Sequence, residues 1–348
     1  MEKIDIIIPV YKAHNTLGRA LASIACQWGK EDVKVTLVND ACPEGDYQEI
    51  INRFLPELDI QELILKNNVG PGDARQYGID NTNNAYILFL DADDCLASAL
   101  SLFFLREKLD NNPSLVVVAG QPIEQLSDFT WGEIDPRNAI WLFGKLYRRS
   151  FLEREGIRFQ KGSRSNEDVG FNNCITLLCK EDESKIATID VTVYIWMRNI
   201  ESITRRNNGE YRYTEGITGF VDNLLYAYDF IKKKGLLSSD RYVFYQMASW
   251  IVSMYIGYSD TLEKKPQYIE QTWEQCQRLY DGCIRNNKEY IPSTCWREAW
   301  GDIVKEELSS GRLFWEKEIL PISFNDFLEG LDKQQGPVIH SFITDNLK

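Results

Sequence analysis

Four short apolar runs are spaced along the N-terminal part of the chain, and each has the length of a buried strand: 4–10, 33–38, 61–65 and 85–90. Segments of helical periodicity separate them. Alternation of strand and helix is typical of a doubly wound, mainly parallel sheet flanked by helices. In such a sheet ligands bind at the carboxyl ends of the strands, so the residues just after each run are the candidates for function.

Helices are expected wherever apolar residues recur on one helical face. The first has an apolar stripe made of Leu17, Leu21, Ile24 and Trp28. Asn15 or Thr16 is placed to cap its start. Shorter helices are expected at 46–55 and 72–81, which follow the second and third strands.

The pattern becomes mixed after the fourth strand. A helix is expected at 167–179, with one apolar face made of Phe171, Cys174, Ile175 and Leu178. A strand is expected at 191–197. Both belong to the first of two domains, residues 1–205, which we expect to have the α/β architecture.

Long helical patterns rich in Tyr and Trp dominate the rest of the chain. One covers 215–234 and has Gly235 as its stop, and another begins near Ser239. We therefore expect a mostly α-helical second domain, residues 206–348. Aromatic residues at helical spacing are typical of a core or of contacts between subunits, so this region could bind an acceptor or form a homo-oligomer. Examples are Trp250, Tyr255, Trp296 and Trp300.

The formal net charge of −13 argues against nucleic acid or an anionic membrane as a partner. Basic side chains do cluster locally, although such a cluster is more often a solvated face: Arg148, Arg149, Arg154, Arg158, Lys161 and Arg164. A strand is expected from the first residues on, without the pattern of a signal peptide, so no such peptide is expected, and no apolar run has membrane-spanning length. We therefore expect a cytoplasmic protein without stable membrane insertion, either free or peripheral to the membrane.

The cysteines are expected to be reduced and buried, because the 8 of them form no CxxC pair and lie in predicted core segments. The only histidines are His14 and His340. A Cys/His zinc site is therefore not expected.

The fourth apolar run ends abruptly in the acidic residues Asp91, Asp93 and Asp94. Carboxylates at the mouth of a sheet suit Mg²⁺ or Mn²⁺, which complete their coordination with phosphates and water. The alternative is an Asp-rich turn that caps the next helix, and an isolated motif would favour it.

Polar residues also follow the second and third runs. Asp40 could accept a hydrogen bond from a base or ribose, or it could form an Asx turn before the loop at 43–45. A glycine-rich turn leads into a helix that carries Arg75, which would bring backbone N–H groups and a guanidinium near a pyrophosphate. No G-x-G-x-x-G fingerprint follows the first strand.

These motifs, in this order, resemble those of family-2 glycosyltransferases, which have the GT-A fold. The resemblance covers about residues 4–205 and rests on the segments 7–11, 38–40, 68–75, 89–94, 141–149, 156–159, 166–168 and 202–204. The family usually has Asp-Asp where this chain has Asn39-Asp40. That difference bears on which base the protein selects.

The resemblance implies nucleotide contacts for five residues. Pro9 and Tyr11 would line the nucleotide pocket, and Asp40 would hold the base. Arg75 would lie near the base, ribose or diphosphate, and Asp91 would contact the ribose side.

The resemblance also implies that Asp93 binds the divalent metal, Mn²⁺ or Mg²⁺, and that Asp168 is the catalytic base. Both residue types suit the chemistry. A metal stabilises the charge on a leaving diphosphate, and a carboxylate can take the proton of an attacking hydroxyl. For Glu167 and Asp168 the alternative is simply a favourable placement of acids in the first turn of a helix.

The expected function is therefore inverting, metal-dependent transfer of a sugar from a nucleotide-sugar donor, a UDP-sugar by family preference, to a hydroxyl acceptor. Surface polysaccharide or glycoconjugate precursors, including lipid-linked glycans, fit as acceptors. A protein or modified-DNA acceptor is an alternative. A non-catalytic nucleotide-binding or interaction module is a second alternative. A sugar nucleotidyltransferase is a third, but it would need a glycine-rich, Arg- or Lys-bearing loop directly after the first strand.

Overall fold

The computed structural model describes residues 1–137, 140–179, 185–199, 202, 206–237, 241–309 and 323–335. The chain divides into two compact units, Met1–Ser202 and Ile203–Lys348. His340, the helix start expected near Ser239 and the end of the 202–204 motif lie outside the described residues.

One mixed sheet forms the centre of the first unit. Its strands run in the order β3-β2-β1-β4-β8-β6-β9-β5, with β7 beside β6. Their bounds are β1 Ile4–Val10, β2 Val33–Asn39, β3 Asp59–Ile64, β4 Tyr86–Phe89, β5 Cys95–Leu96, β6 Val117–Gln125, β7 Trp131–Glu133, β8 Lys145–Arg148 and β9 Ile186–Trp196. The four strands β3, β2, β1 and β4 are parallel, whereas β8 is antiparallel to β4 and β6.

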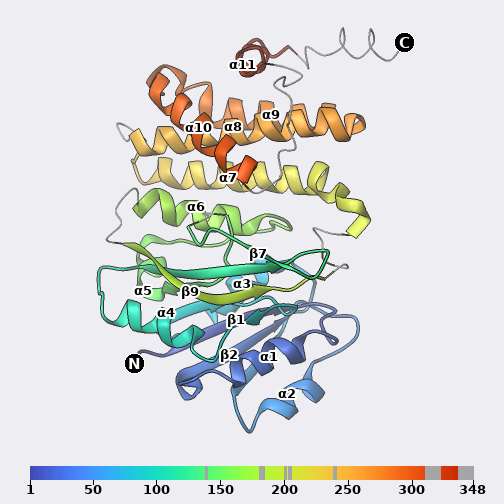
Figure 1. Cartoon of the computed structure of the whole chain (residues 1–348), viewed down its shortest axis with the longest axis vertical. Helices are drawn as coiled ribbons and strands as arrows, with labels where there is room; N and C mark the ends of the chain where they lie inside the picture. The colour runs from blue at the N-terminus through green and yellow to red at the C-terminus, as the bar shows by residue number, and fades with distance from the viewer. Residues whose placement is uncertain are drawn as a thin grey trace. The chain divides into compact units, whose positions relative to one another are not determined.

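Helices cover both faces of this sheet, as Figure 1 shows for α1 and α2 on one side and α6 on the other. They are α1 Leu17–Ala25, α2 Gln48–Phe54, α3 Pro71–Asp80, α4 Ser101–Asp110, α5 Arg149–Glu155 and α6 Glu167–Cys179. Buried residues of α1, α2 and α4 belong to the same core cluster as alternate β1 residues such as Ile6 and Ile8. The helix α3 packs on the opposite face, where Gly78 lies directly over Ile7. The predicted α/β sheet with flanking helices is confirmed.

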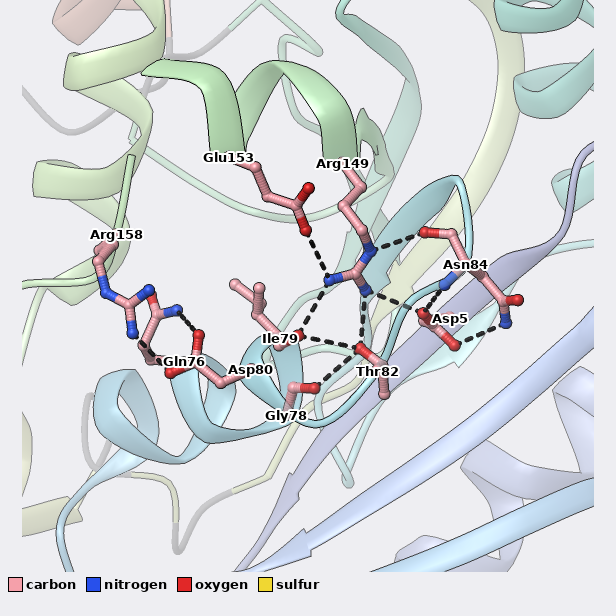
Figure 2. A network of polar contacts seen from close by, with 10 residues as sticks. All are labelled: Asp5, Gln76, Gly78, Ile79, Asp80, Thr82, Asn84, Arg149, Glu153 and Arg158. Atoms are coloured by element: carbon pink, nitrogen blue, oxygen red, sulfur yellow. Dashed lines mark hydrogen bonds and ion pairs between the residues drawn. The ribbon is translucent and has the colours of Figure 1, made fainter. Parts of the chain in front are cut away.

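Most of the basic cluster at 148–164 is exposed to solvent, but Arg149 is buried in a network of polar contacts (Figure 2). Its guanidinium donates to Asp5 Oδ2 at 2.9 Å and to the carbonyls of Asn84 and Ile79 at 2.7 and 2.9 Å. Arg149 therefore ties α5 to β1 and to the end of α3. The charge of Arg149 is neutralised inside the fold by the buried Asp5.

Three local expectations were wrong. The helix α1 ends at Ala25, so Trp28 lies beyond it and is 58% exposed. Thr16 is at the cap position, but its hydroxyl donates to the Ala13 carbonyl and makes no capping bond. The helix α6 has the expected bounds, but its buried surface is broader than the one predicted face, because Val169 and Leu177 are buried as well as Phe171, Cys174 and Ile175.

The second unit is helical in its described part. Its helices are α7 Glu215–Lys233, α8 Arg241–Lys264, α9 Ile269–Leu279, α10 Ser293–Ser309 and α11 Phe324–Lys333. Gly235 follows α7 with φ of +73°, as its predicted role as a stop requires. Tyr255, Trp273 and Phe327 pack together in an aromatic core. Among the described helices none combines the length and the apolar character that crossing a membrane demands.

Candidate active site

Parallel pairing brings the ends of β1, β2 and β4 to one edge of the sheet. Val10 is paired with Asn39, and Ile7 is paired with Phe89. Pro9 lies half-buried within β1, and Tyr11 follows the strand with 45% of its surface exposed. Pro9, Tyr11 and the acidic residues after β4 are thus presented from neighbouring strands.

Asp40 is buried after β2 and holds the turn that precedes α3. Its two carboxylate oxygens accept the backbone N–H groups of Val69 and Gly70 at 2.7 and 2.9 Å. The loop after β2 is held instead by Asn39, whose side-chain oxygen accepts the Cys42 N–H at 2.9 Å. The amide of Asn39 also donates to Glu62 at 3.0 Å. The departure from the usual Asp-Asp pair therefore has a structural role in the loop after β2.

Arg75 joins three elements of the site through its guanidinium. Nη2 pairs with Asp91 after β4 at 2.5 Å, and Nη1 pairs with Glu167 at the start of α6. Burial lowers the pKa of Arg75, but these two carboxylates outweigh it and raise the pKa. Arg75 is therefore a fixed positive charge between two acids. Its planar guanidinium pairs with each acid through a different nitrogen.

Of the three acidic residues after β4, Asp94 has a structural role, whereas Asp91 and Asp93 face the site. Asp94 is buried, and its carboxylate accepts the Tyr194 hydroxyl at 2.7 Å and the Met197 N–H at 2.8 Å. Asp91 is 30% exposed. The chain enters the short strand β5 after this turn, so the acids do not cap a helix.

Asp93 has an environment that favours a cation beside it. Its Oδ2 accepts the Asn199 amide at 2.9 Å, while its backbone carbonyl accepts from Arg19. Burial and the nearby charge of Asp91 raise the pKa of Asp93. A divalent cation would lower that pKa, and carboxylate oxygens are the ligands that Mg²⁺ and Mn²⁺ prefer.

Asp168 lies half-buried in the first turn of α6, within the same group of charges. Its Oδ1 accepts the Val169 N–H at 2.9 Å. Burial raises its pKa to about 7; Glu167 adds to this rise, and Arg75 opposes it. A carboxylate that titrates near neutral pH is well suited to general-base catalysis.

Two residues near Asp168 were not identified from the sequence. Lys145 in β8 is buried, donates to the Trp141 carbonyl at 2.6 Å and feels the charge of Asp168. Burial lowers the pKa of Lys145 to about 7. Gly72 allows α3 to approach α6, because a Cβ there would lie 2.9 Å from the Glu167 Cβ. A lysine that follows the apolar residues 141–143 was a usable signal, whereas the Gly72 contact joins segments that are far apart in the sequence and had none.

Comparison with known proteins supplies an independent line of evidence. Residues 5–165 match the family model for Glycosyl transferase family 2. The chain is 26% identical over 230 residues to the uncharacterized glycosyltransferase EpsJ of Bacillus subtilis, which covers 58% of this chain and 62% of that protein. It is 26% identical over 182 residues to the poly(ribitol-phosphate) beta-glucosyltransferase of Bacillus spizizenii, covering 49% and 28%. The chain thus spans less than two thirds of the length of these relatives.

The fold has a counterpart among solved structures. The crystal structure of S. aureus TarS 1-349 in complex with UDP-GlcNAc is similar to the structure of this chain, with a TM-score of 0.54 and 17% sequence identity. The similarity covers 89% of this chain and 92% of that one. At this level of identity it concerns the fold alone.

Proposed function

Residues 5–165 of this chain are a family-2 glycosyl transferase domain of GT-A type, and from that premise we propose that the protein is a metal-dependent, inverting glycosyltransferase. One observation carries the proposal. Arg75 links Asp91 to Glu167, and the neighbour of Glu167 is Asp168, whose pKa is raised to about 7. The guanidinium of Arg75 and the carboxyl groups proposed for metal binding and for catalysis thus lie close together at the edge of the sheet.

The proposed donor is a nucleotide sugar, in the first instance a UDP-sugar. The position of Pro9 and Tyr11 at the end of β1 supports a nucleotide pocket there, with Asp40 on the base and Arg75 and Asp91 toward the ribose and diphosphate. Asp40 already accepts two N–H groups, but each carboxylate oxygen keeps a lone pair for a base N–H. The TarS complex with UDP-GlcNAc is consistent with this choice.

Asp93 is the residue proposed to hold the divalent cation, Mn²⁺ or Mg²⁺, with Asp91 beside it. The raised pKa of Asp93 supports this, since crowded acidic groups are relieved by a bound cation. When bound, such a cation stabilises the negative charge that develops on a departing diphosphate.

Asp168 is proposed to accept the proton of the acceptor hydroxyl. The oxygen then attacks the anomeric carbon while the bond from that carbon to the diphosphate oxygen breaks on the opposite side, which inverts the configuration. Because the pKa of Asp168 is about 7, a large fraction of the group is ionised at neutral pH. Glu167 is held by Arg75, so Asp168 keeps its place at the start of α6.

We propose a surface polysaccharide or another glycoconjugate precursor as the acceptor, because one relative is named for action on poly(ribitol-phosphate). The catalytic domain would comprise residues 1–205. Residues 206–348 would bind the acceptor or form a homo-oligomer. An acceptor of this kind would place the protein in the cytoplasm, free or at the membrane surface.

A thermal-shift panel of nucleoside diphosphates and their sugars, with and without Mn²⁺, tests the donor and metal assignments. A ligand at 100 times its Kd should stabilise the folded protein by about 2.7 kcal/mol. Asp93→Ala should lose the metal-dependent part of the shift. Asp59→Ala, the same substitution at an exposed position on β3, is the matched control and should keep it. No shift with any nucleotide would refute the proposal.

A further inference from the structure

Three side chains of different ligand types meet where the loops after β1 and β2 come together: His14, Cys42 and Glu44. One ligand atom of each lies within 4.8 Å of the other two. Nδ1 of His14 is 3.1 Å from Oε2 of Glu44. In a tetrahedral site with bonds of about 2.0 Å, nitrogen and oxygen ligands lie roughly 3.3 Å apart, so this pair is already at coordination distance.

The other ring nitrogen of His14 is held as in a metal-binding histidine. Nε2 lies 3.0 Å from the Asp46 carbonyl oxygen, which can only accept, so Nε2 carries a hydrogen. The ring also stacks on Tyr47 with centroids 4.2 Å apart and planes at 19°. In the neutral ring Nδ1 therefore presents a lone pair toward a carboxylate. A proton or a cation between Nδ1 and Glu44 is needed to make that contact favourable.

The backbone of both loops is shaped around the Cys42 sulfur. Lys12 and Ala41 have positive φ angles of 53° and 52°, a region that residues with a side chain rarely adopt. The strained turn at Lys12 directs its N–H at Sγ of Cys42, at 3.3 Å. Such strain persists where the surroundings require it, and it is concentrated at binding sites. A backbone donor is thus already directed at the sulfur that would bind the ion.

We propose that His14, Cys42 and Glu44 bind a divalent cation of the zinc class, with water as the fourth ligand. A thiolate and a carboxylate balance the charge of the ion, and the sulfur needs to move by about one ångström to complete a tetrahedron. This site differs from the one at Asp93, because sulfur and imidazole select a softer metal than carboxylates alone. The bound ion would fix the two loops that flank Asp40 and Tyr11.

Cobalt titration of the full chain tests this proposal without any activity assay. Co²⁺ replaces Zn²⁺ in tetrahedral sites, and its bond to a thiolate gives a charge-transfer band in the near ultraviolet. We expect the band to saturate at one equivalent and to disappear when Zn²⁺ is added. Cys42→Ser should abolish it. Cys26→Ser removes an exposed thiol and is the matched control that should keep it.

Two further variants separate loss of a ligand from loss of the fold. Glu44 is 54% exposed, so Glu44→Gln should fold normally and weaken Co²⁺ binding at least tenfold. Asp93→Asn should leave the thiolate band unchanged, which also makes the result independent of the proposed transferase activity. Absence of a thiolate band in the native protein, or its persistence in Cys42→Ser, would overturn the proposal.

Discussion

Arg75 is the side chain on which the charges of the candidate site converge. It is 7% exposed, and it pairs with one carboxylate on the strand edge and one on α6. Removing one partner of a buried ion pair leaves the others uncompensated, at a cost of about 3–5 kcal/mol. An exposed pair is worth far less. The contrast between Arg75 and the exposed pair of Arg158 with Asp80 therefore gives a direct test at the scale of a residue.

Arg75→Lys should destabilise the protein by about 1–3 kcal/mol and impair donor binding, because an ammonium cannot hold Asp91 and Glu167 in one plane. Arg158→Lys makes the same change at the exposed pair and should alter stability by less than about 0.5 kcal/mol. Urea unfolding of both variants provides the comparison. Equal effects would mean that Arg75 does not bridge the site.

Asp168 should give the activity a rising pH dependence. Since its pKa is raised to about 7, the rate should increase as pH rises toward 7 and then level off. The same shift has the opposite effect on stability, because the folded state holds the proton more tightly than the unfolded chain. Stability contributed by the protonated group is therefore lost as pH rises from about 4 through about 7.

Asp168→Asn should remove that loss, so its stability should exceed that of the native protein at pH 8 and approach it near pH 5. Unfolding curves at the two pH values measure the difference. If the native protein and the variant differ equally at both, the carboxyl does not titrate near neutrality. That outcome would rule out the role of Asp168 as a base poised at physiological pH.

Single residues differed in how well the sequence revealed them. The positions of Asp91, Asp93 and Asp168 in the fold could be identified because each follows a recognisable strand or starts a recognisable helix. The partner of Asp94 could not, because the Tyr194 hydroxyl comes from 100 residues away. The same holds for His14, which meets Cys42 across two loops. Contacts of this kind depend on tertiary packing, which local patterns do not encode.

At the scale of elements, the site depends on the close approach of α3 and α6. Gly72 lies in the first turn of α3, directly against the side chain of Glu167. This contact places Arg75, one turn along α3, beside the start of α6. The strands that carry the site were predictable from their apolar runs, but the distance between these two helices was not.

Gly72→Ala should disturb this approach, because the added Cβ would lie 2.9 Å from Cβ and 3.0 Å from Cγ of Glu167. We expect a loss of about 1–3 kcal/mol in stability and weaker donor binding. Gly18→Ala is the control. A Cβ at Gly18 in α1 meets nothing within 4 Å, so that change should be neutral or stabilising by up to about 1 kcal/mol. Donor titration and thermal melting of both variants would show whether the α3–α6 contact matters.

At the scale of the whole molecule, the change in pattern along the sequence already indicated an α/β part followed by a helical part. The aromatic residues of the second part pack mainly on one another, as Tyr255 does with Trp300 and Phe327. Burial in this core explains why aromatic residues recur at helical spacing in the second part. The charged groups on which the proposed function rests lie at the strand edge of the first unit.

Turnover of a nucleotide sugar tests the central claim most directly. With Mn²⁺ present and water or a glycan as acceptor, the native protein should release nucleoside diphosphate from at least one donor. Asp168→Asn should still bind that donor but react about 10²- to 10⁴-fold more slowly, since it cannot take the proton. Donor binding without any release by the native protein, or an unchanged rate in Asp168→Asn, would contradict the account.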